Sequence, residues 1–153
     1  MRTIGVISDT HGLLRPQALA ALKGSALIVH AGDVGDPKIL DDLRQIAPVV
    51  AVRGNVDRGV WAGRLPSSEI VDHDGVRLYV LHILEELDLD PPTAGFAAVI
   101  SGHSHRPKVE AKDGVLYFNP GSAGPRRFDL PVSIGKLALV GGKLNGEIVY
   151  LDV

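Results

Sequence analysis

Short apolar runs alternate with longer amphipathic stretches in the first third of the chain. Residues 2–8, 26–32 and 49–55 are apolar and rich in β-branched side chains, which is typical of buried strands. Residues 15–24 are a predicted helix, with Pro16 suited to its first turn and Gly24 to its end. Residues 36–48 are a second, with apolar positions on one face and Pro48 beyond its end. Because parallel neighbours need a crossover between them, this alternation predicts a parallel α/β start.

The pattern changes in the second half of the chain. Residues 69–82 and 108–119 each contain two extended runs around an Asp-Gly pair, which is a hairpin signal. A buried strand is predicted over 96–101, and two more strands around a glycine-rich turn over 132–153. The stretch 83–95 is helix or turn.

The expected fold class is therefore α/β, with antiparallel pairing concentrated in the second half. Two packed β-sheets flanked by helices would accommodate this number of strands. The sequence shows neither an internal repeat nor a linker, so residues 1–153 are predicted to form a single domain.

Composition excludes several classes of function. Apolar residues make up 45% of the 153 residues and charged residues 22%, as in an ordinary folded protein. A formal charge of −2 gives no support for specific nucleic-acid binding, and the absence of cysteine excludes thiolate zinc sites and thiol nucleophiles. No signal peptide or membrane-spanning run is recognised, so we expect a cytoplasmic protein without a membrane partner. The oligomeric state stays open.

Five of the apolar runs end in side chains that can bind a metal ion. Because ligands gather outside the carboxyl ends of strands in α/β sheets, we expect these side chains to converge. Seven nitrogen and oxygen ligands are too many for one tetrahedral zinc ion but suit two ions that share a carboxylate. The seven candidates are Asp9, His11, Asp33, Asn55, His82, His103 and His105.

These residues lie in motifs that resemble a known family. "DTHG", "GD", "GNVD", "LH" and "GHSH" occur in the order found in the calcineurin-like metallophosphoesterases. "NPGS" at 119–122, followed by "PRR", resembles the small bacterial and archaeal phosphodiesterase branch of that superfamily. The resemblance covers essentially the whole chain and implies the calcineurin-like metallophosphoesterase fold with a two-metal site.

The resemblance also implies a role for each ligand. Asp9, His11 and His105 would hold one ion, and Asn55, His82 and His103 the other. Asp33 would be the bridging carboxylate, since its two oxygens can be shared and its charge offsets repulsion between the cations. Such a donor set accepts Mn²⁺, Zn²⁺, Fe or Ni²⁺, and the resemblance favours two Mn²⁺ ions.

The function expected from this site is metal-dependent phosphodiester hydrolysis of a small phosphate ester. A hydroxide activated by two metal ions would attack phosphorus, so the chain needs no nucleophile of its own. The catalytic members of the set would be Asp33, Asn55 and His82. Asn55 would also contact substrate, together with Arg126, whose guanidinium suits a phosphate.

Three features depart from the wider family pattern. Many of these enzymes carry a histidine after the asparagine, thought to protonate the leaving group, whereas this chain has Val56. Good leaving groups should therefore be preferred. The usual "HGH" is here His82-Ile83-Leu84, and the segment 83–96 that follows is short, which leaves the size of the substrate pocket open.

Other readings remain open. The retromer scaffold subunit resembles the same fold but uses it for protein binding with an incomplete metal site, and a phosphomonoesterase is a further alternative. His30 is expected to pack or hydrogen-bond behind the ligands, and Asp57 to orient a ligand. His73, at a predicted hairpin, is expected to be a solvated surface residue. Gly121 and Ser122 either shape a loop near the metals or end a hairpin.

Overall fold

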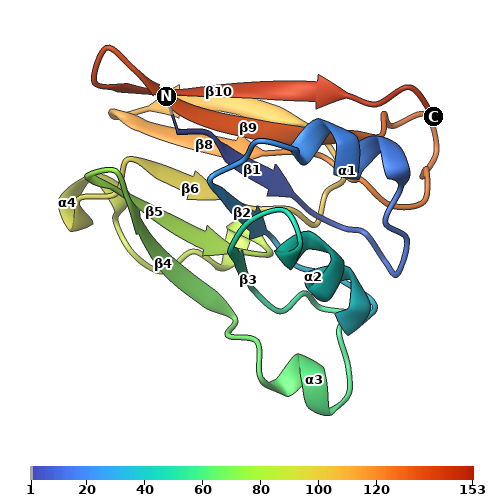
Figure 1. Ribbon diagram of the computed structural model, residues 1–153. Coiled ribbons are helices and arrows are strands. Elements are labelled where there is room, and N and C mark those ends of the chain that lie inside the picture. The colour runs from blue at the N-terminus through green and yellow to red at the C-terminus, as the bar shows by residue number, and fades with distance from the viewer. Residues whose placement is uncertain (1) are drawn as a thin grey trace.

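Two five-stranded sheets packed face to face make up the body of the molecule (Figure 1). This arrangement is seen in a computed structural model, which describes residues 2–153. One sheet, here sheet A, has the order β10-β9-β1-β2-β3, and sheet B has the order β4-β5-β6-β8-β7. The strands of sheet A are β1 (Ile4–Ile7), β2 (Leu27–His30), β3 (Val49–Ala51), β9 (Ser133–Val140) and β10 (Lys143–Tyr150). Those of sheet B are β4 (Ser68–His73), β5 (Val76–Leu81), β6 (Ala98–Ile100), β7 (Lys108–Lys112) and β8 (Val115–Asn119).

The strand directions confirm the predicted start and refine the second half. β1 and β2 are parallel, as are β2 and β3, and the crossovers between them carry the two predicted helices. All three expected hairpins form, as β4–β5, β7–β8 and β9–β10. The second half is nevertheless mixed rather than antiparallel throughout, because β6 lies parallel to both β5 and β8.

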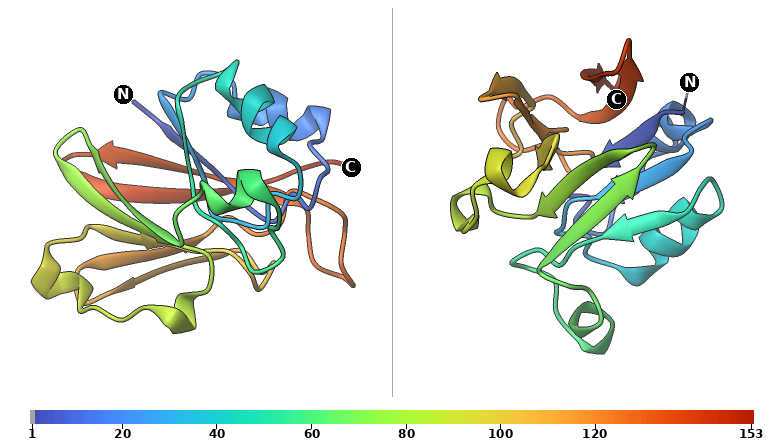
Figure 2. Two further views of the ribbon diagram at one scale, coloured as in Figure 1. Left: turned by 90° about the horizontal axis from the view of Figure 1, so that it is seen from below. Right: turned by 90° about the vertical axis from the view of Figure 1, so that its left-hand side faces the viewer.

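The longer helices lie on one side of the molecule. Both begin with proline, and Asp36 caps the second by accepting a hydrogen bond from the Lys38 N–H. Their apolar faces pack on the outer side of sheet A, whereas α4 lies on the opposite side of the molecule (Figure 2). The helices are α1 (Pro16–Leu22), α2 (Pro37–Arg44), α3 (Val60–Gly63), α4 (Pro91–Ala94) and the 3₁₀ helix η1 (Leu84–Glu86). The sequence pattern does not predict α3, because this helix is a single turn and too short to show a helical period.

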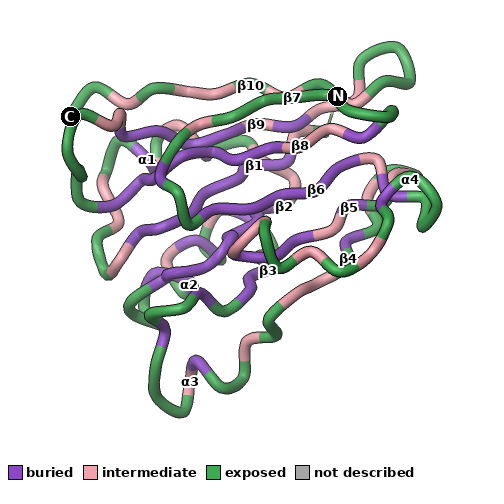
Figure 3. The backbone as a smooth tube through the Cα atoms, turned by 180° about the vertical axis from the view of Figure 1, so that it is seen from behind, coloured by how far each residue is buried: buried purple, intermediate pink, exposed green. Residues whose placement is uncertain are grey.

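The core between the sheets is made by the alternate residues that face inward. Val6, Val29, Val80 and Ile100 belong to this cluster and are fully buried. The central strands of both sheets are buried along most of their length, whereas β7 is exposed throughout (Figure 3). Burial of this kind stabilises a fold by roughly 1.5–3 kcal/mol for each large apolar side chain.

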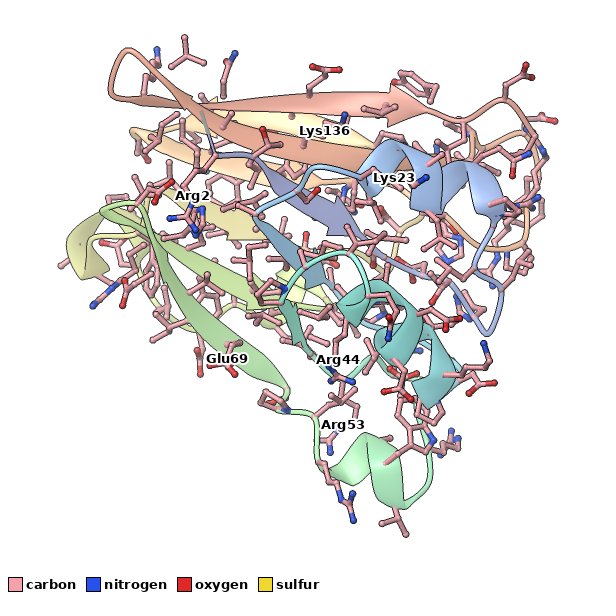
Figure 4. The ribbon with its side chains drawn as sticks, viewed as in Figure 1. Arg2, Lys23, Arg44, Arg53, Glu69 and Lys136 are labelled. Atoms are coloured by element: carbon pink, nitrogen blue, oxygen red, sulfur yellow. The ribbon has the colours of Figure 1, made fainter. Side chains whose placement is uncertain are left out.

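Charged residues cover the outside and form local ion pairs. Arg44, labelled on α2 in Figure 4, lies 3.0 Å from Asp41, and Arg2 lies 3.2 Å from Asp74. The expectation that His73 is solvated is wrong, because its side chain is only 12% exposed and lies 3.4 Å from the Asp74 carboxylate. Across residues 2–153, none of the helices has the length and apolar character needed to cross a bilayer.

One close contact between the sheets gives a test of this packing. The ring of Phe118, which is 1% exposed, fits against Gly135 of β9, and a Cβ at Gly135 would overlap that ring. We expect Gly135→Ala to lower the free energy of unfolding by about 1–3 kcal/mol, since the ring would have to shift in a close-packed core. Urea denaturation measures this difference.

Gly63→Ala is the matched control for that substitution. A Cβ at Gly63 meets no atom within 4 Å, and the residue lies at the end of a helix, where alanine is tolerated or favoured. Equal unfolding midpoints for the two variants would contradict the packing described here.

Candidate metal centre

Residues at the carboxyl ends of four strands converge on one place. Asp9 and His11 follow β1, and Asp33 follows β2 in the same sheet. His82 follows β5, and the segment that carries His103 and His105 follows β6. Each sheet thus supplies three side chains to a shared centre, two Asp and one His from sheet A and three His from sheet B, which fits the prediction made from the strand ends.

Asp9, His11 and His105 form the first cluster. Asp9 Oδ1 lies 3.4 Å from His105 Nε2 and 3.7 Å from His11 Nε2. The two imidazoles also bring their Nε2 atoms within 3.4 Å of each other. One carboxylate oxygen and two ring nitrogens therefore point at the same small volume, as the ligands of a metal ion do.

Asp33, His82 and His103 form the second cluster. His82 Nε2 lies 3.1 Å from Asp33 Oδ2, and the rings of His82 and His103 are 5.2 Å apart at their centroids. Asn55, expected to bind the same ion, has its Oδ1 3.2 Å from His103 Nδ1. All seven expected ligands therefore lie in or against the two clusters.

Asp33 lies between the two clusters. Its Oδ2 is 3.1 Å from His82 Nε2 on one side and 3.7 Å from His11 Nε2 on the other. Its Oδ1 accepts a hydrogen bond of 3.0 Å from the Val56 N–H. This bond fixes the carboxylate so that Oδ2 faces both clusters, which is the position a bridging ligand requires.

Hydrogen bonds also select which oxygen of Asp9 is free. Asp9 Oδ2 accepts bonds from the Ser8 hydroxyl at 2.7 Å and from the His103 N–H at 3.1 Å. Asp9 Oδ1 is buried and has no hydrogen-bond partner among residues 2–153. A buried carboxylate oxygen without a donor is costly unless a cation takes that place.

His82 shows the same pattern on a nitrogen. Its Nδ1 lies 2.7 Å from the Ala31 carbonyl oxygen, so Nδ1 carries the proton and donates it. Nε2 then presents its lone pair to Asp33 Oδ2, and in the described part of the chain it too is buried without a hydrogen-bond partner. His82 Nε2 and Asp33 Oδ2 are both acceptors, so their close approach requires a proton or a metal ion between them. The residues present therefore fit a bound cation.

Two glycines allow the loops to approach this closely. A Cβ on Gly54 would overlap the backbone nitrogen and carboxylate of Asp33, and one on Gly102 would overlap the Ser8 hydroxyl. The glycines of "GN" and "GH" in the sequence are therefore needed because neighbouring strand ends meet there.

Five of the seven candidate ligand residues have left-handed backbone conformations. Such a conformation is uncommon outside glycine and costs free energy that the surroundings must supply. Hydrogen bonds from the Asp9 N–H to Gly32 O (3.0 Å) and from the His11 N–H to Asp33 O (2.9 Å) hold two of them. The φ angles are 56° at Asp9, 47° at His11, 56° at Asp33, 72° at His103 and 62° at His105.

Asp57 supports the centre through the backbone rather than through a ligand side chain. Its carboxylate accepts hydrogen bonds from the N–H groups of Val34, Gly35 and Gly54 at 3.2, 2.9 and 2.9 Å. Asp57 therefore ties the loop after β2 to the loop after β3. The expectation that it orients a ligand side chain is replaced by this role, since it accepts from main-chain donors.

His30 lies behind the ligands in a closed hydrogen-bond chain. Its Nδ1 accepts from the Gly32 N–H at 3.1 Å, and its Nε2 lies 3.0 Å from the Thr10 hydroxyl, which donates to Val34 O at 2.8 Å. Complete burial lowers the pKa of His30 to about 4, so its imidazole is neutral at physiological pH.

The segment after β8 also contacts the centre. The Ser122 hydroxyl donates to the Asp9 carbonyl at 3.0 Å, and the Ala123 N–H donates to Ser8 O. The contact of Ser122 with Asp9 supports the reading that this segment shapes a loop near the candidate ligands, although both residues also follow the end of the β7–β8 hairpin. Arg126 and Arg127 follow in an exposed stretch, and the charge of Arg127 opposes protonation of His11.

Charges at the centre shift the pKa values of its ligands in opposite directions. Burial raises the pKa of Asp9, but His105, His11 and Ser8 outweigh it and hold that pKa well below its usual range. The pKa of Asp33 is also lowered, mainly because hydrogen bonds from His82 and the Val56 N–H outweigh the effect of burial. Asp9 raises the pKa of His11 despite burial, and Asp33 and Asp9 do the same for His82. Without a metal ion, protons on these imidazoles balance the carboxylates.

Comparison with known proteins agrees with the geometry. A family model for the calcineurin-like phosphoesterase superfamily domain matches residues 1–140. The chain is 35% identical over 161 residues to a probable metallophosphoesterase of Methanothermobacter thermautotrophicus, with 95% of this chain and 91% of the relative covered.

Solved structures share the fold. An archaeal phosphodiesterase matches with a TM-score of 0.80 and 22% identity, over 96% of this chain and 99% of that chain. Vps29 of Chaetomium thermophilum matches with a TM-score of 0.78 and 20% identity, over 97% of this chain and 95% of that chain. Both likenesses support the predicted arrangement of two packed sheets.

Competition between protons and metal at His11 and His82 predicts a pH dependence. In the metal-free protein their raised pKa values stabilise the fold below the unfolded value of 6.5, and this contribution is lost as pH rises through the folded values. Metal binding displaces these protons and is therefore favoured by higher pH. A fixed concentration of divalent metal, about 100 times Kd at pH 8, should raise Tm at that pH by roughly 5–10 °C. Calorimetry should show this increment growing between about pH 6 and 8.

His73→Gln is the control for that measurement. His73 is the histidine paired with Asp74 in the β4–β5 hairpin, away from the seven ligands, so the variant should keep the full pH dependence. An increment in Tm that is the same at both ends of the pH range would rule out the proton–metal competition.

Proposed function

The chain belongs to the calcineurin-like phosphoesterase superfamily, in its small archaeal and bacterial metallophosphoesterase branch, and we propose that it is a two-metal phosphodiesterase. The observation that carries this proposal is the pair of clusters, in which His82 Nε2 lies 3.1 Å from Asp33 Oδ2 and 3.9 Å from Asp9 Oδ1. Asp9 Oδ1 and His82 Nε2 are both buried without a hydrogen-bond partner among residues 2–153. Such a donor set selects divalent cations.

The proposed ligand assignment follows the clusters. Asp9, His11 and His105 hold one ion, Asn55, His82 and His103 hold the other, and Asp33 is shared. When bound, two divalent ions lower the pKa of a water molecule and offset the charge of a phosphate. Mn²⁺ is the proposed metal, because nitrogen and oxygen donors without thiolate suit it and the phosphodiesterase branch resembled by the "NPGS" motif favours it.

The direction of substrate approach follows from burial. Asn55 and His103 are exposed, whereas Asp9, Asp33 and His105 are buried. A phosphate ester therefore meets the centre from the side of Asn55, whose amide can donate a hydrogen bond to a phosphate oxygen. Arg126 is proposed to contact the same ester, because guanidinium suits a phosphate and the charge of neighbouring Arg127 already acts on His11 of the first cluster.

Leaving-group chemistry favours activated esters. Val56 occupies the position next to Asn55, is 43% exposed and offers only its backbone N–H, which is already bonded to Asp33 Oδ1. The chain thus provides no side-chain acid at this position to protonate an alkoxide. Esters whose leaving group is stable as an anion, such as aryl diesters, should react fastest.

A non-catalytic binding role is the alternative that the shared fold raises. Against it stands the complete ligand set, including His11, with geometry already suited to cations. A phosphomonoesterase would use the same centre and differs in the charge of the ester it prefers.

Asp33→Asn tests the metal-dependent mechanism. Loss of the shared negative charge should lower divalent metal content at least about tenfold and reduce aryl-diester hydrolysis by about 10³-fold or more. Metal content is measured on the purified protein, and hydrolysis with an aryl diester and the matching aryl monoester in Mn²⁺. Full activity in a variant shown to be metal-free would refute the mechanism. A faster rate with the monoester would favour the phosphomonoesterase, and no turnover of either ester the binding role.

Val56→His tests the missing acid. A histidine here should accelerate hydrolysis of alkyl diesters by up to about 10²-fold while changing aryl-diester hydrolysis little, because only the poor leaving group needs a proton. Val60→His, four residues on and 78% exposed, is the control and should alter neither rate. Equal acceleration of both ester types would show that the new histidine acts in another way.

A further inference from the structure

Apart from the candidate metal centre, the structure has a cavity against the loop that carries His103 and His105. Its volume is about 420 Å³, within the usual range for small-molecule sites. Residues of the loop line it alternately: Gly102, Ser104 and Arg106 face the cavity, whereas His103 and His105 belong to the metal clusters. None of the seven candidate metal ligands lines the cavity, so it is separate from the metal centre, although residues 102–106 contribute to both.

The register of sheet B explains which side chains reach this cavity. Ile100 and Phe118 pair across β6 and β8 and point into the core between the sheets. The next positions on each strand, Ser101 and Asn119, therefore point outward, and Lys108 pairs with Asn119 on the same outer face. A row of polar side chains thus crosses the outer face of sheet B at its carboxyl end.

Some hydrogen-bond donors of these polar side chains have no acceptor within the described part of the chain. The Asn119 amide is fully used, since it donates to Gly102 O and to Ser104 Oγ and accepts from the Gly121 N–H. Ser104 Oγ accepts from both Asn119 and the Arg106 N–H, so its own proton remains free to donate.

Ser101 and Arg106 add two further free donors. Ser101 is 5% exposed, yet its hydroxyl makes no hydrogen bond with any of residues 2–153. The Arg106 guanidinium, at the mouth of the cavity, forms no ion pair in the described part of the chain. Lys108, also in the lining, lies 2.8 Å from Glu110 and is already paired. The free hydrogen-bonding groups are therefore donors, which favours a ligand that offers acceptors and negative charge.

The remaining walls are apolar. Tyr117 and Leu84 line the cavity and are half-buried. Both belong to a cluster on the outer face of sheet B that also contains Val99 and Leu81. A flat apolar group can lie against such a surface while a charged group reaches the donors.

We propose that this cavity binds a small aromatic anion, with its carboxylate or phosphate group held by Ser101, Ser104 and Arg106 and its ring against Tyr117 and Leu84. Guanidinium binds both kinds of anion in the same bidentate geometry, so the chemistry common to them defines the ligand. Glu85, which lies at the rim, disfavours ligands of high negative charge.

Amide NMR spectra of the full chain in saturating Zn²⁺ test the proposal. The probes are benzoate, phenylphosphonate, whose phosphorus–carbon bond is not an ester, neutral benzamide and inorganic phosphate. We expect benzoate or phenylphosphonate, or both, to shift the amides of Ser101, Ser104 and Tyr117 saturably, with benzamide binding at least about tenfold more weakly. Tighter binding of benzoate would identify the ligand's anionic group as a carboxylate. Tighter binding of phenylphosphonate would identify it as a phosphate.

Variants localise the binding. Arg106→Gln should weaken the aromatic anion about tenfold or more, and Ser101→Ala about threefold, because each removes a donor without breaking a hydrogen bond in the protein. Arg64→Gln, a substitution at an exposed arginine beyond α3, is the matched control and should leave affinity unchanged. The spectra themselves show whether each variant remains folded.

Three results would overturn the proposal. The first is the absence of saturable shifts with either aromatic anion at concentrations up to about 10 mM. A Kd above that concentration corresponds to only a weak encounter between ligand and protein. The second is a set of shifts confined to Asn55, His82 and their neighbours, which would place binding at the metal centre alone. The third is equal affinity in Arg106→Gln and Arg64→Gln.

Discussion

Two carboxylates, Asp9 and Asp33, are buried side by side with their remaining oxygens turned toward imidazole nitrogens. Negative charge in such surroundings persists only if positive charge is brought to it. Much of the local structure serves that requirement: Ser8 and Val56 occupy one oxygen of each carboxylate, and Ala31 fixes the tautomer of His82. Because the candidate ligands come from both sheets, a cation bound there would also join the sheets at one end of the core.

Local pattern was sufficient to predict most of the fold. Residues 69–82 and 108–119 formed the hairpins that their Asp-Gly turns indicated, and the proline-started helices lie where expected. The sequence did not predict that β6 would lie between two parallel neighbours, since that depends on which distant strand pairs with it. It also missed the single turn of α3, where periodicity has nothing to repeat.

The site shows the same division between local and distant information. Asp9, Asp33, His82, His103 and His105 could be found because each follows an apolar run directly. Placement of Ser122 near the metals was only one of two readings, and its hydrogen bond to Asp9 O was not predicted, because that bond spans 113 residues of sequence. His73 was misjudged for a related reason: its hairpin position suggested solvent, but contact with Asp74 leaves the side chain largely covered. Asp57 accepts only main-chain donors, which no sequence motif specifies.

The left-handed backbone at five ligand positions also limits what the site can become. Asn, Asp and His adopt this conformation several-fold more often than other residues with a Cβ, for which it costs roughly 1–2 kcal/mol. These three amino acids are also borderline or hard donors rather than soft ones. Engineering the centre toward a thiophilic metal such as Cu(I) by introducing cysteine would therefore meet a conformational penalty at every such position. The shape of the main chain, and not only the choice of side chains, keeps this centre committed to oxygen and nitrogen chemistry.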